Sequence, residues 1–409
     1  MKQTLNQLQS DKHKIKLLVV DDSAFMRSAI SMMVRDEDDI EIVAQGKNGL
    51  EAIELTKKHN PDIITLDIEM PKMDGLEALG VIMKECPTPV VMISSLTTEG
   101  AESTLKAFEL GAVDFISKEM SFVNVDITKI KDDLIRKLRH FAKNKKSVTK
   151  SLLSHRTMEI DTSSPKSSKY GFSRIKVQKF NLDKGLKLNK SAEPEPSKTS
   201  TASEIDKIVN RKPTFKINKS NKFKVLCIGT STGGPIALQH LIPLFPKDFP
   251  VPIVIVQHMP PNFTKSLAMR LDTSSQLNVR EATLGEEIQP GNVYVAPGGK
   301  HLTLKKEGAI ISLHLSDNPY GLFHKPSVDV MMSSAANFCK ENILSVILTG
   351  MGKDGLEGIR RLKSKGAYVI AQDEATCIVY GMPKVVIESN LADDILPLDK
   401  IKDKIMSLV

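Results

Sequence analysis

The stretch KVLCIGTSTGGPIALQHL, residues 224–241, decides how the second half of this chain folds. Apolar residues fill its start, small and polar residues fill 229–234, and PIALQHL follows with the spacing of an amphipathic helix. This order predicts a buried strand that turns directly into a helix. The turn Gly229-Thr-Ser-Thr-Gly233 fits a nucleophile elbow, a glycine-rich phosphate cradle and an ordinary strand-to-helix turn equally well.

Working outward from this stretch, long apolar runs recur at VPIVIVQH (251–258), ILSVILTG (343–350) and AYVIAQD (367–373). Apolar runs without alternation predict a central sheet that is buried on both faces. The shorter pieces GNVYVAP, HLTL and AIISLHL predict an antiparallel extension or hairpins. We therefore expect a Rossmann-like α/β domain over 223–409, with a mostly parallel sheet and an antiparallel extension.

Reactive side chains follow three of these expected strands. Ser231 lies at the first turn, His258 ends the second strand, and Asp354 follows a late strand. A hydroxyl, a base and a carboxylate at one sheet edge are what nucleophilic acyl transfer requires. Gly233 and Gly234 would let the backbone pass close to a substrate, at a helix start that stabilises negative charge.

Two competing templates can be weighed on the residues alone. A Walker-type cradle requires a lysine after its last glycine, and none follows Gly234, so that interpretation fails. The loop Gly350–Gly355 fits the dinucleotide fingerprint, with Asp373 as its ribose-binding acid. A dinucleotide-binding enzyme therefore stays open as an alternative, although it leaves Ser231 and His258 unexplained.

The N-terminal part, 14–142, alternates five apolar runs with five amphipathic stretches, which predicts a doubly wound, five-stranded parallel sheet. Functional residues of such sheets gather where the strands end. Carboxylates brought to one edge repel one another unless a cation lies among them, and oxygen ligands suit Mg²⁺. The expected strand ends carry Asp21, Asp22, Asp67, Ser94, Ser95 and Lys118.

The net charge of +8 is concentrated between the two expected domains. Residues 141–222 hold 20 Lys or Arg and 7 Asp or Glu, a net +13, which leaves about −5 for the remainder. Together with the absence of a recognition-helix or zinc pattern, this argues against nucleic acid as a partner. We predict that 143–222 is a solvated linker, rich in Lys and Ser and without a fixed fold.

Cysteine usage and hydropathy indicate the compartment. The four cysteines lie far apart with no ligand spacing, and no run of 18 apolar residues occurs. The N-terminus lacks the apolar stretch of a signal peptide. We expect a cytoplasmic protein that is not inserted in a membrane.

The motifs VVDDS, LDIEMPKMDGL, ISS and FISK resemble the receiver domain of two-component response regulators. The resemblance implies that Asp67 is the phosphoacceptor and that Mg²⁺ binds Asp21, Asp22, Asp67 and the backbone carbonyl of Glu69. It further implies a switch set made of Ser94, Lys118 and Phe115.

The motifs GTSTGG, QHMP, VYVAPGGKH, HKPSVD and LTGMGKDG resemble the chemotaxis protein-glutamate methylesterases of the CheB family. The resemblance implies Ser231 as nucleophile, His258 as base and Asp354 as orienting acid, with no cofactor for catalysis. Candidates for oxyanion or substrate contacts are Thr232, Gly233 and Met351.

The same resemblance implies partners. The substrates would be glutamate methyl esters, and also glutamines, on methyl-accepting chemoreceptors. A chemotaxis histidine kinase would phosphorylate Asp67, so that the receiver domain no longer covers the active site. A connecting segment of about 80 residues departs from the shorter linkers expected for the family. A non-catalytic, receptor-binding adaptor is a second alternative.

Overall fold

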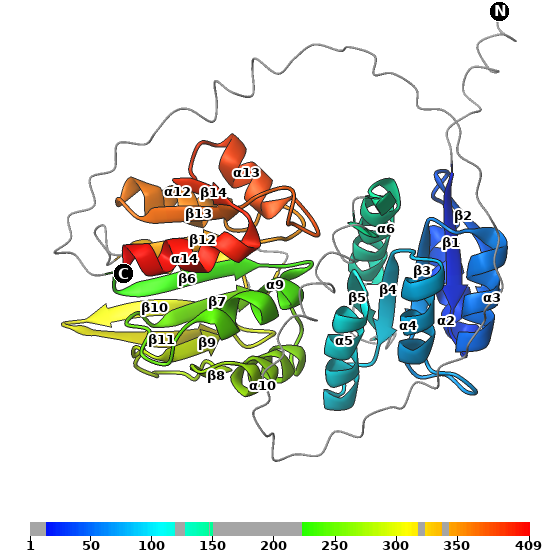
Figure 1. The fold of residues 1–409 in the computed structure, drawn as a ribbon, viewed down its shortest axis with the longest axis horizontal. Coiled ribbons are helices and arrows are strands. Elements are labelled where there is room, and N and C mark those ends of the chain that lie inside the picture. The colour runs from blue at the N-terminus through cyan, green and yellow to red at the C-terminus, as the bar shows by residue number, and fades with distance from the viewer. Residues whose placement is uncertain (1–13, 119–126, 147, 150–222, 318–323, 338–342) are drawn as a thin grey trace, which may run out of the picture. The chain divides into compact units, whose positions relative to one another are not determined.

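The computed structural model describes residues 14–118, 127–146, 148–149, 223–317, 324–337 and 343–409 (Figure 1). The predicted linker, 143–222, falls almost wholly outside the described residues, so its character stays a prediction. Within the described ranges, no helix is both long enough and apolar enough to cross a lipid bilayer.

The N-terminal domain, which we define as β1 to α6, is a five-stranded sheet in the order β2-β1-β3-β4-β5. All its neighbouring strands are parallel. The strands are β1 (Ile15–Val20), β2 (Ile40–Gly46), β3 (Ile63–Asp67), β4 (Val90–Ser94) and β5 (Asp114–Ser117). The helices are α2 (Ala24–Val34), α3 (Gly49–His59), α4 (Gly75–Glu85), α5 (Thr98–Leu110) and α6 (Ile127–Lys143). The predicted five-stranded α/β fold is confirmed.

Polar caps fix where the helices of this domain begin. Four cap side chains each accept a hydrogen bond from the backbone N–H of the residue three positions later: Ser23, Asn48, Asp74 and Thr97. Such caps satisfy N–H groups that the helix itself leaves unpaired. Strands β3 and β4 are buried along their whole length. Apart from the buried Thr65 within β3, their polar residues, Asp67 and Ser94, come at the strand ends.

The C-terminal domain, which we define as β6 to α14, has a seven-stranded sheet in the order β14-β13-β12-β6-β7-β9-β8, in which every pairing is parallel. Its strands are β6 (Val225–Thr230), β7 (Ile253–Gln257), β8 (Asn278–Glu281), β9 (Asn292–Val295), β12 (Ile343–Ile347), β13 (Tyr368–Gln372) and β14 (Asp394–Leu396). The helical segments are α9 (Gly234–Leu241), η2 (Ile242–Leu244), α10 (Phe263–Ser274), α11 (Val328–Ala336), α12 (Leu356–Ser364), α13 (Met382–Glu388) and α14 (Leu398–Leu408).

Strand β6 shows why this sheet has no polar face. Leu226 and Ile228 join one apolar cluster with residues of α9, α10 and α14, whereas Val225 and Cys227 join a second cluster with residues of α11, α12 and α13. Because successive side chains of a strand point to opposite faces, a strand covered by helices on both sides must be apolar throughout. The strand predicted from residues 224–229 is confirmed in this form.

The predicted antiparallel part is confirmed as a hairpin, β10 (His301–Glu307) with β11 (Ile310–Ser316), which forms a separate two-stranded sheet. One detail is wrong, because the piece GNVYVAP forms β9 inside the parallel sheet. Strands β8 and β14 were not expected, because each is an edge strand of only three or four residues, of which β8 buries one and β14 buries none. Short edge strands carry too few apolar residues to give a periodic signal.

Candidate functional sites

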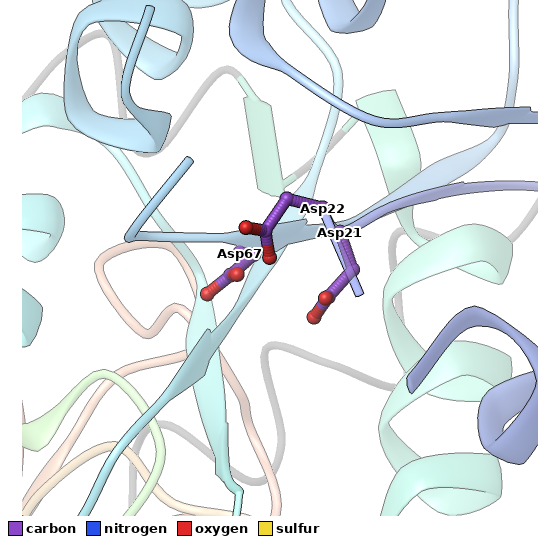
Figure 2. A group of neighbouring side chains, drawn as sticks. All are labelled: Asp21, Asp22 and Asp67. Carbon is purple, nitrogen blue, oxygen red and sulfur yellow. The ribbon is translucent and has the colours of Figure 1, made fainter. Parts of the chain in front are cut away.

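Three carboxylates meet at the end of the N-terminal sheet. Figure 2 shows Asp21 and Asp22, which follow β1, beside Asp67, the last residue of β3. One oxygen from each lies within 4.8 Å of the other two. Asp21 and Asp67 are buried, whereas Asp22 is exposed, so the cluster is open to solvent on one side. The structure thus brings together the three aspartates that the sequence singled out.

The electrostatics of this acidic cluster are unfavourable without a cation. Burial raises the pKa of Asp67 to about 6, and the neighbouring charge of Asp21 adds to the effect against the opposing pull of Lys118. Burial likewise raises the pKa of Asp21. Lys118 Nζ lies 2.7 Å from Asp67 and 3.7 Å from Asp21, so a single lysine serves two carboxylates. Converging oxygens with excess negative charge fit a hard divalent cation such as Mg²⁺.

The other predicted residues of this domain lie around the cluster. Ser94 ends β4, is buried, and its hydroxyl accepts a hydrogen bond from Thr104 Oγ1 at 2.8 Å. The backbone N–H of Glu69 donates to Asp67 Oδ1 at 3.3 Å, while the role of the Glu69 carbonyl stays a prediction. Phe115 lies within β5, buried, with its ring edge-on to Phe108. Thr104, which fixes the Ser94 hydroxyl, was missed because it lies inside a helix, away from any strand end.

The second site lies at the ends of the two central strands of the C-terminal sheet. Ser231 follows β6 and His258 follows β7, and the backbone N–H of His258 donates to Thr230 O at 3.2 Å. His258 Nε2 lies 2.7 Å from Asp354 Oδ2, and both side chains are largely buried. Ser231 and His258 line one pocket. The three residues predicted from separate strand ends are therefore gathered at one edge of the sheet.

Asp354 is held by more than its histidine. Its Oδ1 accepts from Ser327 Oγ, the Asp329 N–H and the Gly355 N–H at 2.9, 3.0 and 3.1 Å, and its Oδ2 also accepts from the Val328 N–H at 2.7 Å. Burial alone would raise the pKa of Asp354, but the hydrogen bonds from His258 and from the start of α11 outweigh it and lower that pKa well below its usual value. Asp354 is thus an anion across the physiological pH range.

The state of His258 follows from this arrangement. With Nε2 bonded to Asp354, Nδ1 is buried and has no hydrogen-bond partner in the described part of the chain. A neutral imidazole that donates through one nitrogen accepts through the other. Nδ1 is therefore the atom available to receive a proton.

Thr349 and Gln257 hold the turn that carries Ser231, and neither was among the predicted site residues. Thr349 O accepts from the Ser231 N–H at 3.1 Å, and Thr349 Oγ1 donates to Thr232 O at 2.9 Å. Gln257 Nε2 donates to Ser231 O at 2.8 Å. Gln257 ends β7 directly before His258, which is the signal that could have found it, whereas Thr349 comes two residues after β12 and two before Met351.

The packing of the turn requires glycine at positions 233 and 234. Gly233 has φ +78°, and a Cβ there would lie 2.7 Å from Ile378 Cβ. A Cβ on Gly234 would lie 2.0 Å from Gln257 Oε1. The protein's own side chains therefore already require glycine at both positions, and the expectation that the backbone here passes close to a substrate stays a prediction.

The oxyanion candidates lie in the right place without a settled role. Thr232, Gly233 and Met351 line the same pocket as Ser231 and His258. The backbone N–H of Ser231 is bonded to Thr349 O and that of Gly350 to Val379 O, so neither is offered to a substrate. The contribution of the three candidates stays a prediction.

Two further histidines lie in this part of the domain. The ring of His324 stacks on that of His258, with centroids 4.0 Å apart and planes 14° apart. Burial, with a contribution from His258, lowers the pKa of His324 to about 3, so the stacked ring is neutral. His301 is completely buried at the start of β10, and burial lowers its pKa as well.

The dinucleotide interpretation of Gly350–Gly355 is not favoured by the structure. Asp373, its supposed ribose acid, caps its own turn by accepting from the backbone N–H and the hydroxyl of Thr376 at 3.0 and 2.6 Å. Within the loop, Asp354 is committed to His258 and α11. The acid and the loop that a dinucleotide would need are thus engaged within the protein.

Comparison with known proteins gives two family matches. A model described as CheB methylesterase matches residues 226–405, and a model described as response regulator receiver domain matches residues 17–127.

Individual relatives match the chain from end to end. Protein-glutamate methylesterase/protein-glutamine glutaminase 1 of Oleidesulfovibrio alaskensis is 43% identical over 400 residues, which cover 97% of this chain and 99% of that protein. The protein-glutamate methylesterase/protein-glutamine glutaminase of Thermotoga maritima is 41% identical over 395 residues, 97% of this chain and 98% of its own length. The crystal structure of the Thermotoga maritima CheB methylesterase catalytic domain is 51% identical, covers 46% of this chain and 100% of that one, and has a TM-score of 0.45.

The length of the connecting segment relative to other family members stays a prediction, because a match over nearly the whole of each relative does not give the length of that relative's own linker.

Proposed function

Because this chain belongs to the CheB methylesterase family with a response regulator receiver domain, we propose that it is a protein-glutamate methylesterase and protein-glutamine glutaminase. The substrates would be glutamate methyl esters and glutamines on methyl-accepting chemoreceptors. The observation that carries the proposal is the constellation of Ser231, His258 and the fully bonded anion Asp354 at one sheet edge.

The chemistry assigns one role to each residue. His258 Nδ1 takes the proton of the Ser231 hydroxyl as its oxygen attacks the ester carbonyl. The tetrahedral intermediate then breaks its bond to the methoxy group, which leaves as methanol with the proton from His258. Water, activated by the same histidine, hydrolyses the acyl-serine to glutamate and restores the hydroxyl. With a glutamine side chain the leaving group is ammonia.

Asp354 supports these steps without exchanging a proton. Its negative charge stabilises the imidazolium that forms on His258, and its bond to Nε2 keeps Nδ1 facing the hydroxyl. Thr232, Gly233 and Met351 are our candidates for contacts to the oxyanion and the substrate. In this scheme catalysis uses the chain's own side chains and requires no cofactor.

Methanol release tests the function directly. Purified protein is incubated with chemoreceptor carrying radiolabelled methyl esters, and volatile methanol is measured for wild type, Ser231→Ala and the control Ser274→Ala. Ser274 is an exposed serine at the end of α10, outside the site. We expect release by wild type and the control, and a loss of at least a thousandfold in Ser231→Ala. Release by Ser231→Ala above a tenth of wild type would overturn the serine mechanism, and none by wild type would favour a receptor-binding adaptor.

The N-terminal domain supplies the regulation in this proposal. Asp67 is the phosphoacceptor, and the phosphodonor is a chemotaxis histidine kinase. Asp21, Asp22, Asp67 and the Glu69 carbonyl would hold Mg²⁺, which supplies positive charge to the acceptor carboxylate and the incoming phosphoryl group. Ser94, Lys118 and Phe115 would respond to phosphorylation of Asp67, so that the receiver domain no longer covers the catalytic site.

The remaining organisation follows the same proposal. We divide the chain into a receiver domain at 14–142, a linker at 143–222 and a catalytic domain at 223–409. A cytoplasmic location stays a prediction of the sequence, and so does the absence of a nucleic-acid partner.

A further inference from the structure

The carboxylate of Asp354 is anchored by a part of the chain that the catalytic scheme leaves without a role. Ser327 and Asp354 are 27 residues apart, and Ser327 is the N-cap of α11. Its hydroxyl donates to Asp354 Oδ1 at 2.9 Å, and the first two N–H groups of α11, those of Val328 and Asp329, donate to the two oxygens. A helix start therefore binds a side-chain anion of its own protein, where its positive end stabilises negative charge.

The two oxygens of Asp354 have separate tasks. Oδ2 faces His258, whereas Oδ1 is held by Ser327, Asp329 and Gly355. Rotation of the carboxylate would break three bonds at Oδ1 together. The anchored oxygen thus fixes the direction in which Oδ2 receives the imidazole.

Ser327 serves Asp354 more than it serves its helix. As a cap it accepts from the Val330 N–H at 3.4 Å, which is long for such a bond, while its proton is committed to Asp354 at 2.9 Å. The residue is 1% exposed, so solvent cannot readily replace the hydroxyl.

We propose that Ser327 is a positioning residue of this enzyme. Its hydroxyl, together with the start of α11, fixes the Asp354 carboxylate, and the fixed carboxylate orients the His258 ring and stabilises its imidazolium form. The inference rests on the proposed hydrolytic function. Ser327→Ala would leave more negative charge free on Oδ2, which stabilises the imidazolium and moves the acid limb of the kcat/KM profile to higher pH. The less firmly held carboxylate would also lower kcat by about tenfold, as losses of orienting partners do at other sites.

Other ionisable groups near His258 and Asp354 could also displace the acid limb of the pH profile. Burial lowers the pKa of His301, and it lowers the pKa of His324 to about 3, so the His324 ring stays neutral throughout the acid limb. Lys325 lies close enough to His301 to contribute to the lowering of its pKa. Asp329 lies beside Asp354, and burial raises its pKa to about 6, so its titration falls within the window. The displacement of the acid limb is therefore measured a second time, by comparing Asp329→Asn alone with the double variant Asp329→Asn, Ser327→Ala.

The control lies on the same helix. Ser334 donates to Met331 O at 2.6 Å and accepts from the Leu304 N–H at 2.9 Å, on the side of α11 that faces β10. Ser334→Ala removes a comparable hydroxyl and should lower the free energy of unfolding to a similar degree. It should leave both kcat and the pH profile unchanged.

The experiment measures kcat and KM for methanol release from pH 5 to 9 in wild type, Ser327→Ala, Ser334→Ala and Ser327→Thr, which keeps the hydroxyl. We expect a lower kcat, little change in KM and a displaced acid limb for Ser327→Ala alone. If Ser327→Ala matches Ser334→Ala in rate and profile, Ser327 is only a helix cap and the inference is wrong. If wild type shows no Ser231-dependent release, the proposed function itself fails, which is a separate outcome. Should Ser327→Thr not fold, the two alanine variants still decide.

Discussion

The two domains place a buried aspartate at the same position, the carboxyl edge of a parallel sheet, and give it opposite properties. Asp67 accepts one backbone hydrogen bond and shares Lys118 with Asp21, and burial raises its pKa to about 6. Asp354 accepts five hydrogen bonds, and its pKa is lowered despite burial. The number of donors aimed at the carboxylate therefore decides its charge, while the position in the fold does not.

The difference matches two kinds of chemistry. A carboxylate that is short of donors is poised to bind a cation and to accept a phosphoryl group, whose charge the added ion offsets. A carboxylate that is saturated with donors is a fixed negative charge that orients a base. Substitutions of the two aspartates test this contrast, and the largest effect is expected at Asp354.

Asp354→Asn should lower methylesterase kcat by about ten-thousandfold, because a neutral amide cannot stabilise the imidazolium and favours the wrong tautomer of His258. Methanol release measures this, with Asp399→Asn, an exposed aspartate of α14, as the matched control. A loss smaller than tenfold would break the contrast, since Asp354 would then be structural.

Asp67→Ala should abolish covalent labelling by a small-molecule phosphodonor in the presence of Mg²⁺, because the acceptor oxygen is gone. Intact-mass spectrometry or radiolabel incorporation measures the result. Asp38→Ala, at an exposed aspartate of the same domain, should label like wild type. Labelling that persists in Asp67→Ala would mean that another residue accepts the phosphoryl group.

Stability should depend on pH through Asp67. The pKa of Asp67 in the folded state, about 6, lies above the ordinary aspartate value of 3.8, so between these two pH values the folded state binds more protons than the unfolded state. The free energy of unfolding of the N-terminal domain should therefore fall as pH rises from about 4 to 6, by up to about 3 kcal/mol. Asp21, whose pKa is also raised, contributes in the same direction.

Urea unfolding of the protein at several pH values checks this expectation. Asp67→Asn should remove most of the slope, and Mg²⁺ should stabilise wild type at pH 7 but not the variant. If the dependence of the unfolding free energy on pH is unchanged in Asp67→Asn, ionisation of Asp67 does not destabilise the folded state and the expectation is wrong.

The smallest effect concerns the connecting segment. Deleting some forty residues within 150–222, while leaving enough chain to join the two domains, should leave the rate of the phosphorylated enzyme within twofold of wild type, because no predicted site residue lies there. Methanol release with and without phosphodonor measures it. A large change in the phosphorylated rate would show that the segment contributes to catalysis as well as connecting the domains.

Much of both sites was readable from strand ends. Asp21, Asp67, Ser231 and His258 all follow apolar runs that become buried parallel strands, and parallel strands bring their carboxyl ends to one edge. Asp354 comes seven residues after β12 ends, so only its loop, and not its bonding, was visible in advance.

The sequence by itself determined the two α/β folds and the residue types at each sheet edge, because apolar periodicity and turn glycines are local properties. Only the tertiary structure decided the charge of Asp354, the anchoring by Ser327 and the stacking of His324 on His258. Apart from the adjacent Gly355, the hydrogen-bond partners of Asp354 are 25 to 96 residues away in the chain, from Asp329 to His258. A pattern of neighbours along the sequence carries no information about such distances, whereas the donors packed around a carboxylate fix its chemistry.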